Sequence, residues 1–203
     1  MVVIIDTKMG NVKSIQSMLR KIGVKSQISH DLEVIDSASR YILPGVGSFD
    51  TGMSYLNNSG IKEVLKRNIE VAKKPILGIC LGMQLLTKGS QEGKLDGLGW
   101  IDAEAYRFDF KSSDIDLPVP NMGWNIAKSS KKNRLWEGLA ENRFYFVHSF
   151  YVKTKIEEET LSTSNYGIEF ASSIHRDNIY GVQFHPEKSH RYGMQLLKNF
   201  SEV

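Results

Sequence analysis

The stretch Ile76-Leu77-Gly78-Ile79-Cys80-Leu81-Gly82 decides the fold, because it joins a strand to a helix through a cysteine flanked by glycines. Residues 76–79 are a short apolar run typical of a buried strand, and residues 81–87 are predicted to be helical. A nucleophile between small residues at such a junction predicts a nucleophile elbow, whose tight turn lifts the middle side chain clear of the sheet. The positive end of the helix would favour the thiolate of Cys80. An inert, buried cysteine is the alternative interpretation.

The same strand–helix alternation extends on both sides of this stretch. In the first half, apolar runs predict strands 2–5 and 41–43, and helical spacings predict helices 15–22, with Gly23 as its cap, and 61–69. In the second half, we predict a strand at 144–147, a hairpin of 168–174 and 179–184 around the turn 175–178, and a closing helix at 193–200. We therefore predict an α/β fold with a doubly wound, mostly parallel sheet, helices on both faces and an antiparallel extension. No clear linker divides residues 1–203, so a single domain is expected.

Composition excludes several classes of function. The 203 residues carry a formal net charge of +3 with 24% charged residues, which does not favour a nucleic-acid or membrane partner. No apolar stretch approaches the roughly 20 residues that span a bilayer, and the N-terminus lacks the features of a signal peptide. A single cysteine forms no intramolecular disulfide or multi-cysteine metal site. We expect a cytoplasmic protein without metal or cofactor, in which the basic segment 128–134 is a solvated loop.

A cysteine nucleophile needs a base, and His185 is the best candidate among five histidines. It follows the apolar run 180–184 and begins His185-Pro186-Glu187, in which the imidazole can take the thiol proton and the carboxylate can hold the other ring nitrogen. A structural histidine is the alternative. His148 also ends an apolar strand, whereas the remaining three are expected at the surface: His30, His175 and His190.

A glycine-rich turn, Pro44-Gly45-Val46-Gly47, follows another predicted strand. Its backbone N–H groups are candidates to bind an oxyanion, although a simple tight turn fits equally well. The G-x-G-x-x-G spacing of a dinucleotide site is absent. Ligands of open α/β sheets bind at the carboxyl ends of the strands, and the cysteine, the histidine and this turn all follow strands. Their shared placement favours a site.

Two motifs in this order resemble a known family. Residues 78–84 (GICLGMQ) are similar to the nucleophile segment of class I (triad) glutamine amidotransferases, and residues 181–187 (GVQFHPE) resemble their histidine–glutamate segment. Within that family the chain most resembles the glutaminase subunit of imidazole glycerol phosphate synthase. The similarity extends from the first strand to the last helix and includes four further segments: 44–49 (PGVGSF), 122–125 (MGWN), 145–149 (YFVHS) and 185–189 (HPEKS).

The resemblance implies a flavodoxin-like core and a role for each matching residue. Cys80 would attack the amide carbon of glutamine, His185 would move protons and Glu187 would orient His185. The other implied roles are an oxyanion hole from Leu81 with Val46 or Gly47, a glutamine site lined by Gly47, Gln84, Glu92 and Ser149, and a partner interface and ammonia path near Asn121, Trp124, Asn125, Tyr145 and Lys188. The implied partner is a (β/α)₈-barrel synthase subunit that uses the ammonia in histidine biosynthesis.

Two departures from the family pattern leave the pathway open. Asn121 replaces the usual histidine before Met-Gly-Trp-Asn, and Asp6-Thr7-Lys8 replaces the usual Asp-Tyr-Gly. A diverged copy that supplies ammonia for surface-polysaccharide sugar amidation is therefore an alternative. A cysteine hydrolase that acts alone and a non-catalytic binding module are two others. Met122-Gly-Trp-Asn and Lys188 argue against the first of these, and the intact cysteine, histidine and glutamate argue against the second.

Overall fold

A computed structural model describes residues 1–110, 115–129, 131–139 and 142–203. Its main sheet has the strand order β2-β1-β3-β4-β13-β12-β10-β6-β5. The half that contains the amino-terminal strands is parallel and consists of β2 (Ser26–Ser29), β1 (Val2–Ile5), β3 (Arg40–Gly45), β4 (Ile76–Cys80) and β13 (Ile179–Val182). The predicted doubly wound, mostly parallel core is confirmed.

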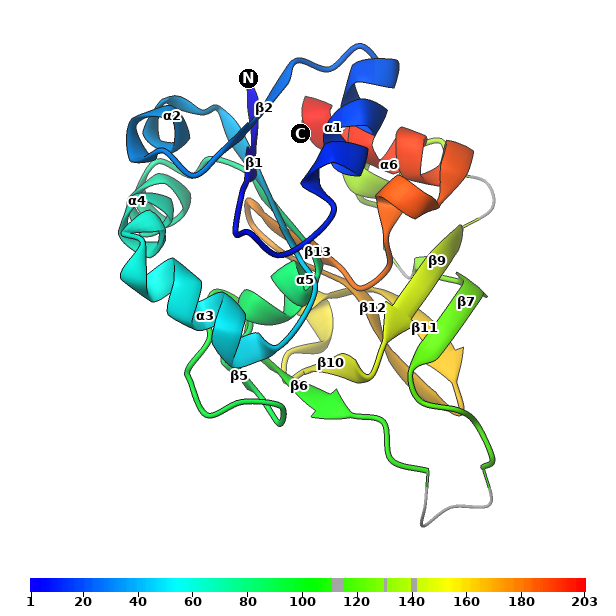
Figure 1. Ribbon diagram of the computed structural model, residues 1–203. Helices are drawn as coiled ribbons and strands as arrows, with labels where there is room; N and C mark the ends of the chain where they lie inside the picture. Colours follow the sequence, from blue (N-terminus) through cyan, green and yellow to red (C-terminus); the bar gives the residue numbers. More distant parts are fainter. Residues whose placement is uncertain (111–114, 130, 140–141) are drawn as a thin grey trace.

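The antiparallel extension begins at β13. Its strands are β12 (Ile168–Arg176), β10 (Phe150–Thr154) and β6 (Ala103–Arg107), with β5 (Gly89–Ser90) parallel to β6, and with β11 (Thr160–Tyr166) between β12 and β8 (Lys128–Ser129). A separate sheet pairs β7 (Asn121–Ile126) with β9 (Arg143–His148), and it flanks the extension (Figure 1).

Helices cover both faces of the parallel half (Figure 1). One face carries α1 (Val12–Lys21) and α6 (His190–Glu202), and the other carries α2 (Leu32–Ser37), α3 (Phe49–Asn58), α4 (Ile61–Lys66) and α5 (Leu81–Leu85). Short helical turns occupy Arg67–Val71, Arg134–Trp136, Glu157–Glu159 and Pro186–Lys188. Strand β1 shows why both faces are buried: Val3 and Ile5 pack into one apolar cluster, whereas Val2 and Ile4 pack into the other. In the described part of the chain, no helix has the length and apolar character needed to cross a bilayer.

Four local expectations need correction. The helix predicted over 61–69 ends at Lys66 and continues as a π-helical turn. Strand β12 runs on to Arg176, so His175 lies in the strand; it is half-buried against Tyr180, with ring centroids 4.5 Å apart, and is not a surface turn residue. The strand predicted at 144–147 is buried only at alternate residues, because it belongs to the small sheet. Segment 128–134 begins as strand β8, and its residue 130 lies outside the described residues.

Strand register brings the predicted functional segments together. Gly45 at the end of β3 pairs with Cys80 at the end of β4, and on the other side Val182 pairs with Ile79. The elbow also needs its glycine, because a Cβ at Gly82 would lie 1.8 Å from the carbonyl oxygen of Leu43. The helix that follows Cys80 therefore packs directly on the neighbouring strand.

Candidate active site

Cys80 stands at a strained turn between β4 and α5. Its φ of 55° and ψ of −110° lie in a region that non-glycine residues rarely adopt, which is typical of a side chain held in place by its surroundings. The side chain is buried. Its sulfur lies 3.9 Å from the carbonyl oxygen of Val147 and 3.7 Å from Nε2 of Gln183. The elbow therefore presents one sulfur atom to a wall formed by β9 and the end of β13.

His185 and Glu187 form a buried pair beside this sulfur. Nδ1 of His185 lies 2.8 Å from Oε1 of Glu187, and both side chains are almost fully buried. Among the described residues, Nε2 of His185 has no hydrogen-bond partner. Burial favours the neutral ring, but Cys80 and the Glu187 carboxylate outweigh it and raise the pKa of His185 to about 10. The pair is thus suited to hold an imidazolium next to a thiolate.

Backbone contacts fix the turn that carries this pair. The His185 N–H donates to the Tyr145 carbonyl at 2.9 Å, and the Ser189 hydroxyl donates to the His185 carbonyl at 2.6 Å while accepting from the Tyr145 N–H at 3.0 Å. Because Gly193 has no Cβ, helix α6 can pack against the carbonyl of Pro186, where a Cβ would lie 1.8 Å away. Strand β9 and helix α6 together hold the His185–Glu187 turn in position.

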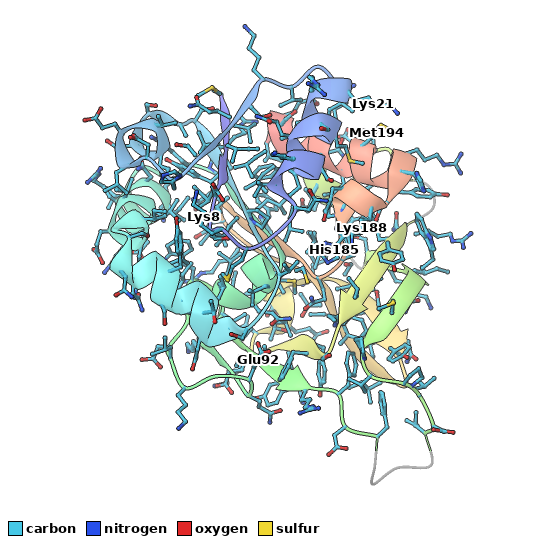
Figure 2. The ribbon with its side chains drawn as sticks, viewed as in Figure 1. Lys8, Lys21, Glu92, His185, Lys188 and Met194 are labelled. Atoms are coloured by element: carbon cyan, nitrogen blue, oxygen red, sulfur yellow. The ribbon has the colours of Figure 1, made fainter. Side chains whose placement is uncertain are left out.

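A cavity of about 330 Å³ opens in front of Cys80. It is bordered by Lys188, predicted for the ammonia path, and by residues predicted to act on or bind the substrate, namely Val46, Gly47, Cys80, Leu81, Gln84, Glu92, Ser149 and His185. Figure 2 labels three of them, with Glu92 lying apart from His185 and Lys188. The structure therefore brings the predicted nucleophile, base, turn and binding residues to one cavity.

The glycine-rich turn lies next to the elbow because β3 pairs with β4. Val46 is 47% exposed and Gly47 has a φ of 100°, so this turn has a backbone conformation that suits glycine at its second position. Leu81 is the first residue of α5, and its N–H has no carbonyl one helical turn earlier to bond. Both segments border the cavity. They are candidate sources of backbone N–H groups close to Cys80.

Two further side chains that border the cavity, those of Glu92 and Gln84, have defined partners. One carboxylate oxygen of Glu92 accepts the Phe49 N–H at 2.8 Å, where α3 begins. Nε2 of Gln84 donates to the Phe150 carbonyl at 3.3 Å and to Oε1 of Gln183 at 3.1 Å. These contacts use the amide nitrogen of Gln84 and leave its oxygen as an acceptor. The Phe49 N–H uses one of the two carboxylate oxygens of Glu92.

The residues predicted near a partner lie outside the cavity, except Lys188. Trp124 is 42% exposed and stacks on His190 with ring centroids 5.6 Å apart, while Nζ of Lys188 lies 5.6 Å from the centre of the Tyr145 ring. Asn125 donates to the carbonyl of Asn165 and ties β7 to β11. Trp124, Tyr145 and Lys188 thus lie along one surface beside the His185 turn, whereas Asn125 is on the opposite face of β7.

Asn121 is different, because it is buried behind His148, which borders the cavity. Its Nδ2 lies 3.0 Å from Nε2 of His148, whose Nδ1 lies 2.7 Å from the Phe150 carbonyl. A carbonyl only accepts, so Nδ1 carries the proton and Nε2 accepts from Asn121. Burial lowers the pKa of His148 to about 4, which keeps the ring neutral.

His148 and Gln183 were not singled out for the site from the sequence. His148 borders the cavity, and Gln183 contacts the nucleophile sulfur. His148 is a polar residue that ends an apolar run, and Gln183 is a polar residue within one, so both give a signal in the sequence, but their contacts depend on strand pairing. Polar residues near strand ends beside the His185 segment thus indicate site residues in this fold.

Comparisons with known proteins agree with this geometry. The family model for "Glutamine amidotransferase class-I" matches residues 3–203. Relatives include imidazole glycerol phosphate synthase subunit HisH 2 of Methanococcus maripaludis, 51% identical over 98% of both chains, and HisH 2 of Pseudomonas aeruginosa, 45% identical over the full length of both. A crystal structure of a glutamine amidotransferase has the same fold, with a TM-score of 0.77 and 19% identity over 100% of both chains. The chain therefore belongs to the class-I glutamine amidotransferase family.

Proposed function

We propose that this chain is the glutaminase subunit of an imidazole glycerol phosphate synthase. It hydrolyses L-glutamine to glutamate and ammonia, and the ammonia passes to a (β/α)₈-barrel subunit that makes imidazole glycerol phosphate and AICAR in histidine biosynthesis. The observation that carries the proposal is that Cys80 and His185 border one cavity, while Glu187 is paired with the far side of the His185 ring. The names of full-length relatives at 41–51% identity give the pathway.

The chemistry follows from the positions of these side chains. The thiolate of Cys80 attacks the amide carbon, a C–S bond forms, and the carbonyl electrons move to oxygen. The negative oxygen is stabilised by N–H groups of Leu81 and of the Val46–Gly47 turn. The C–N bond then breaks, and the leaving nitrogen takes a proton from His185. Water, deprotonated by His185, hydrolyses the thioester and returns the electron pair to sulfur.

The far end of the cavity suits the charged end of glutamine. The free carboxylate oxygen of Glu92 is placed to bind the α-ammonium group, and Gly47 and Ser149 border the same space. The amide oxygen of Gln84 is free to accept an N–H of the substrate. Because a buried acceptor without a donor is costly, this arrangement favours glutamine over substrates that lack these N–H groups.

The small sheet is the surface we assign to the synthase subunit. Three large apolar side chains of β7 are exposed, Met122, Trp124 and Ile126. Lys188 and Tyr145 lie between this surface and the cavity. An exposed apolar patch rimmed by polar residues marks a protein interface. We take the ammonia path to leave the cavity on this side.

The proposal treats residues 1–203 as one glutamine amidotransferase domain in the cytoplasm, where its single cysteine stays reduced. The alternative suggested by Asn121 and Lys8, a diverged copy for sugar amidation, gains no support from the names of the relatives. Asn121 is accounted for by its bond to His148, and Lys8 forms an exposed ion pair with Asp6 at 2.8 Å.

One experiment tests the proposal. Glutaminase activity is measured for the chain alone, and then with the barrel subunit and its nucleotide substrate. We expect activity to rise sharply in the complex and to disappear in Cys80→Ser. High glutaminase activity that is the same with and without the barrel subunit would instead indicate a hydrolase that acts alone. Full activity of Cys80→Ser would reject the mechanism.

A further inference from the structure

The side chain of Gln183 lies between the nucleophile and the wall of the site. Its Nε2 is 3.7 Å from the sulfur of Cys80, and its Oε1 accepts from Nε2 of Gln84 at 3.1 Å. The side chain is fully buried. Gln183 follows directly after β13, whose last residue, Val182, pairs with Ile79, the neighbour of Cys80. Sheet register thus places this amide beside the sulfur.

A chain of hydrogen bonds fixes which end of the amide faces the sulfur. The Phe150 carbonyl only accepts, so the NH₂ group of Gln84 must face it. The same NH₂ group contacts Gln183, which therefore turns its oxygen toward Gln84 and its NH₂ group toward Cys80. His148 donates to the same carbonyl and is itself held by Asn121. The Phe150 carbonyl therefore sets the direction of the donor at the sulfur, through the side-chain amides of Gln84 and Gln183.

We propose that Gln183 is a further catalytic residue, whose side-chain N–H donates to the Cys80 sulfur and stabilises the thiolate. The proposal rests on the proposed glutaminase function and assigns this residue a role in it. Gln183 holds the thiolate before attack. Its N–H donates to the thiolate again when water cleaves the thioester and the C–S electron pair returns to sulfur. Gln183 itself neither gains nor loses a proton.

The strength of the contact depends on the charge of the sulfur. A neutral thiol is a weak acceptor, whereas a thiolate makes a charge-assisted hydrogen bond that is roughly twice as strong. A buried N–H that faces sulfur is therefore best satisfied when Cys80 is ionised. The other titratable groups that border this cavity are Glu92, His148, His185 and Lys188, with Glu187 behind His185. All of them remain unchanged when only Gln183 is replaced.

The chain contains one cysteine, so alkylation by iodoacetamide reports on Cys80 alone. The rate of alkylation across pH gives the pKa of its thiol, and kcat is measured with the barrel subunit present. In Gln183→Met, which removes the donor, we expect the thiol pKa to rise by about one unit and kcat to fall about tenfold, with little change in KM. In Gln183→Glu, which keeps an acceptor for Gln84 and adds negative charge, we expect a larger rise.

Asn199→Leu is the matched control. Asn199 is also a buried amide, but it donates to the carbonyls of Leu135 and Glu137 under helix α6. We expect this variant to unfold at a lower denaturant concentration without any change in the thiol pKa. A purely structural role for Gln183 would give the same pattern in Gln183→Met.

Folded Gln183 variants that alkylate with the wild-type pH profile and keep kcat would overturn the proposal. If Gln183→Glu does not fold, because a carboxylate is costly to bury, Gln183→Met decides, because methionine is neutral and close to glutamine in size. Failure of the proposed function looks different. A wild-type chain that does not hydrolyse glutamine with its partner would reject the glutaminase assignment, whereas an unchanged thiol pKa rejects only the role of Gln183.

Discussion

Asn121 and His148 face each other across the small sheet as a register pair, with Nδ2 of Asn121 3.0 Å from Nε2 of His148 and both side chains buried. The asparagine that departs from the family pattern therefore supports a histidine that borders the cavity. An amide donor is the right partner for a histidine whose other nitrogen already donates to the Phe150 carbonyl. Through His148, Asn121 fixes the chain where β9 ends and β10 begins.

The pair should contribute measurably to stability. In Asn121→Leu, Nε2 of His148 stays buried without a donor, and we expect the free energy of unfolding in urea to fall by about 1–3 kcal/mol. The double variant Asn121→Leu/His148→Phe should recover part of this loss, because both polar groups are then removed together. Asn57→Leu, at an exposed position of α3, is the control and should be nearly neutral. A fully stable Asn121→Leu would show that the bond contributes nothing.

Acid should destabilise the protein through His148. Its pKa is about 4 in the folded state and about 6.5 when unfolded. Between these values only the unfolded chain binds the proton, so the free energy of unfolding falls as the pH drops from 6.5 to 4 and levels off below that. We expect a loss of about 2 kcal/mol from this group between pH 7 and pH 5. His148→Gln should lose less over that range in urea titrations, and equal losses in both proteins would contradict the prediction.

Removing the charge behind His185 should slow the reaction. Glu187→Gln keeps an oxygen acceptor for Nδ1 at the same position but no longer favours the imidazolium. We expect the pKa of His185 to fall and kcat for glutamine hydrolysis to drop about a hundredfold, with the pH–rate profile showing the shift. Glu63→Gln, on the exposed side of α4, is the control and should retain wild-type kcat. A Glu187→Gln enzyme with an unchanged profile would remove Glu187 from the mechanism.

The elbow should not tolerate a methyl group at Gly82. A Cβ there would lie 1.8 Å from the backbone oxygen of Leu43, so β3 and α5 would have to separate. We expect Gly82→Ala to lower the free energy of unfolding by about 3 kcal/mol or more and to abolish glutaminase activity. Gly89→Ala is a fair comparison, because nothing lies within 4 Å of a Cβ at that position. Thermal unfolding of both variants decides, and equal melting temperatures would contradict the prediction.

The exposed face of β7 should bind the synthase subunit. Trp124→Ala removes a large aromatic side chain that is 42% exposed, and we expect the Kd for the barrel subunit to rise at least tenfold. The chain alone should keep its fold, since Trp124 stacks only at the surface on His190. Ile156→Ala replaces an equally exposed apolar residue at another place and should leave the Kd unchanged. Calorimetric titration measures both, and equal affinities would move the interface elsewhere.

The parallel core could be predicted from the sequence because its elements have strong local signals. Val2–Ile5 and Ile76–Cys80 are continuous apolar runs, and Gly23 caps α1 with a φ of 78°. The strands of the extension are harder to predict, since β6 and β11 mix polar with apolar residues, and β6 pairs with β10, which lies more than 40 residues later in the chain.

The candidate site divides in the same way. Cys80, His185 and Glu187 stand in motifs that carry their own signal. Gln183 and His148 have roles that depend on distances between strands, which composition and spacing do not encode. Asn121 was noticed as a departure, but its burial against His148 required the pairing of β7 with β9.

The pairing of β4 with β13 also determines when the catalytic side chains come together during synthesis of the chain. Gln183 lies 103 residues after Cys80, and His185 follows it, so the ribosome produces the nucleophile long before its base. Contacts of such long sequence separation form late in folding. An unfinished or truncated chain therefore carries a cysteine without its imidazole partner, and glutamine is not consumed until synthesis is nearly complete and the two strands have paired.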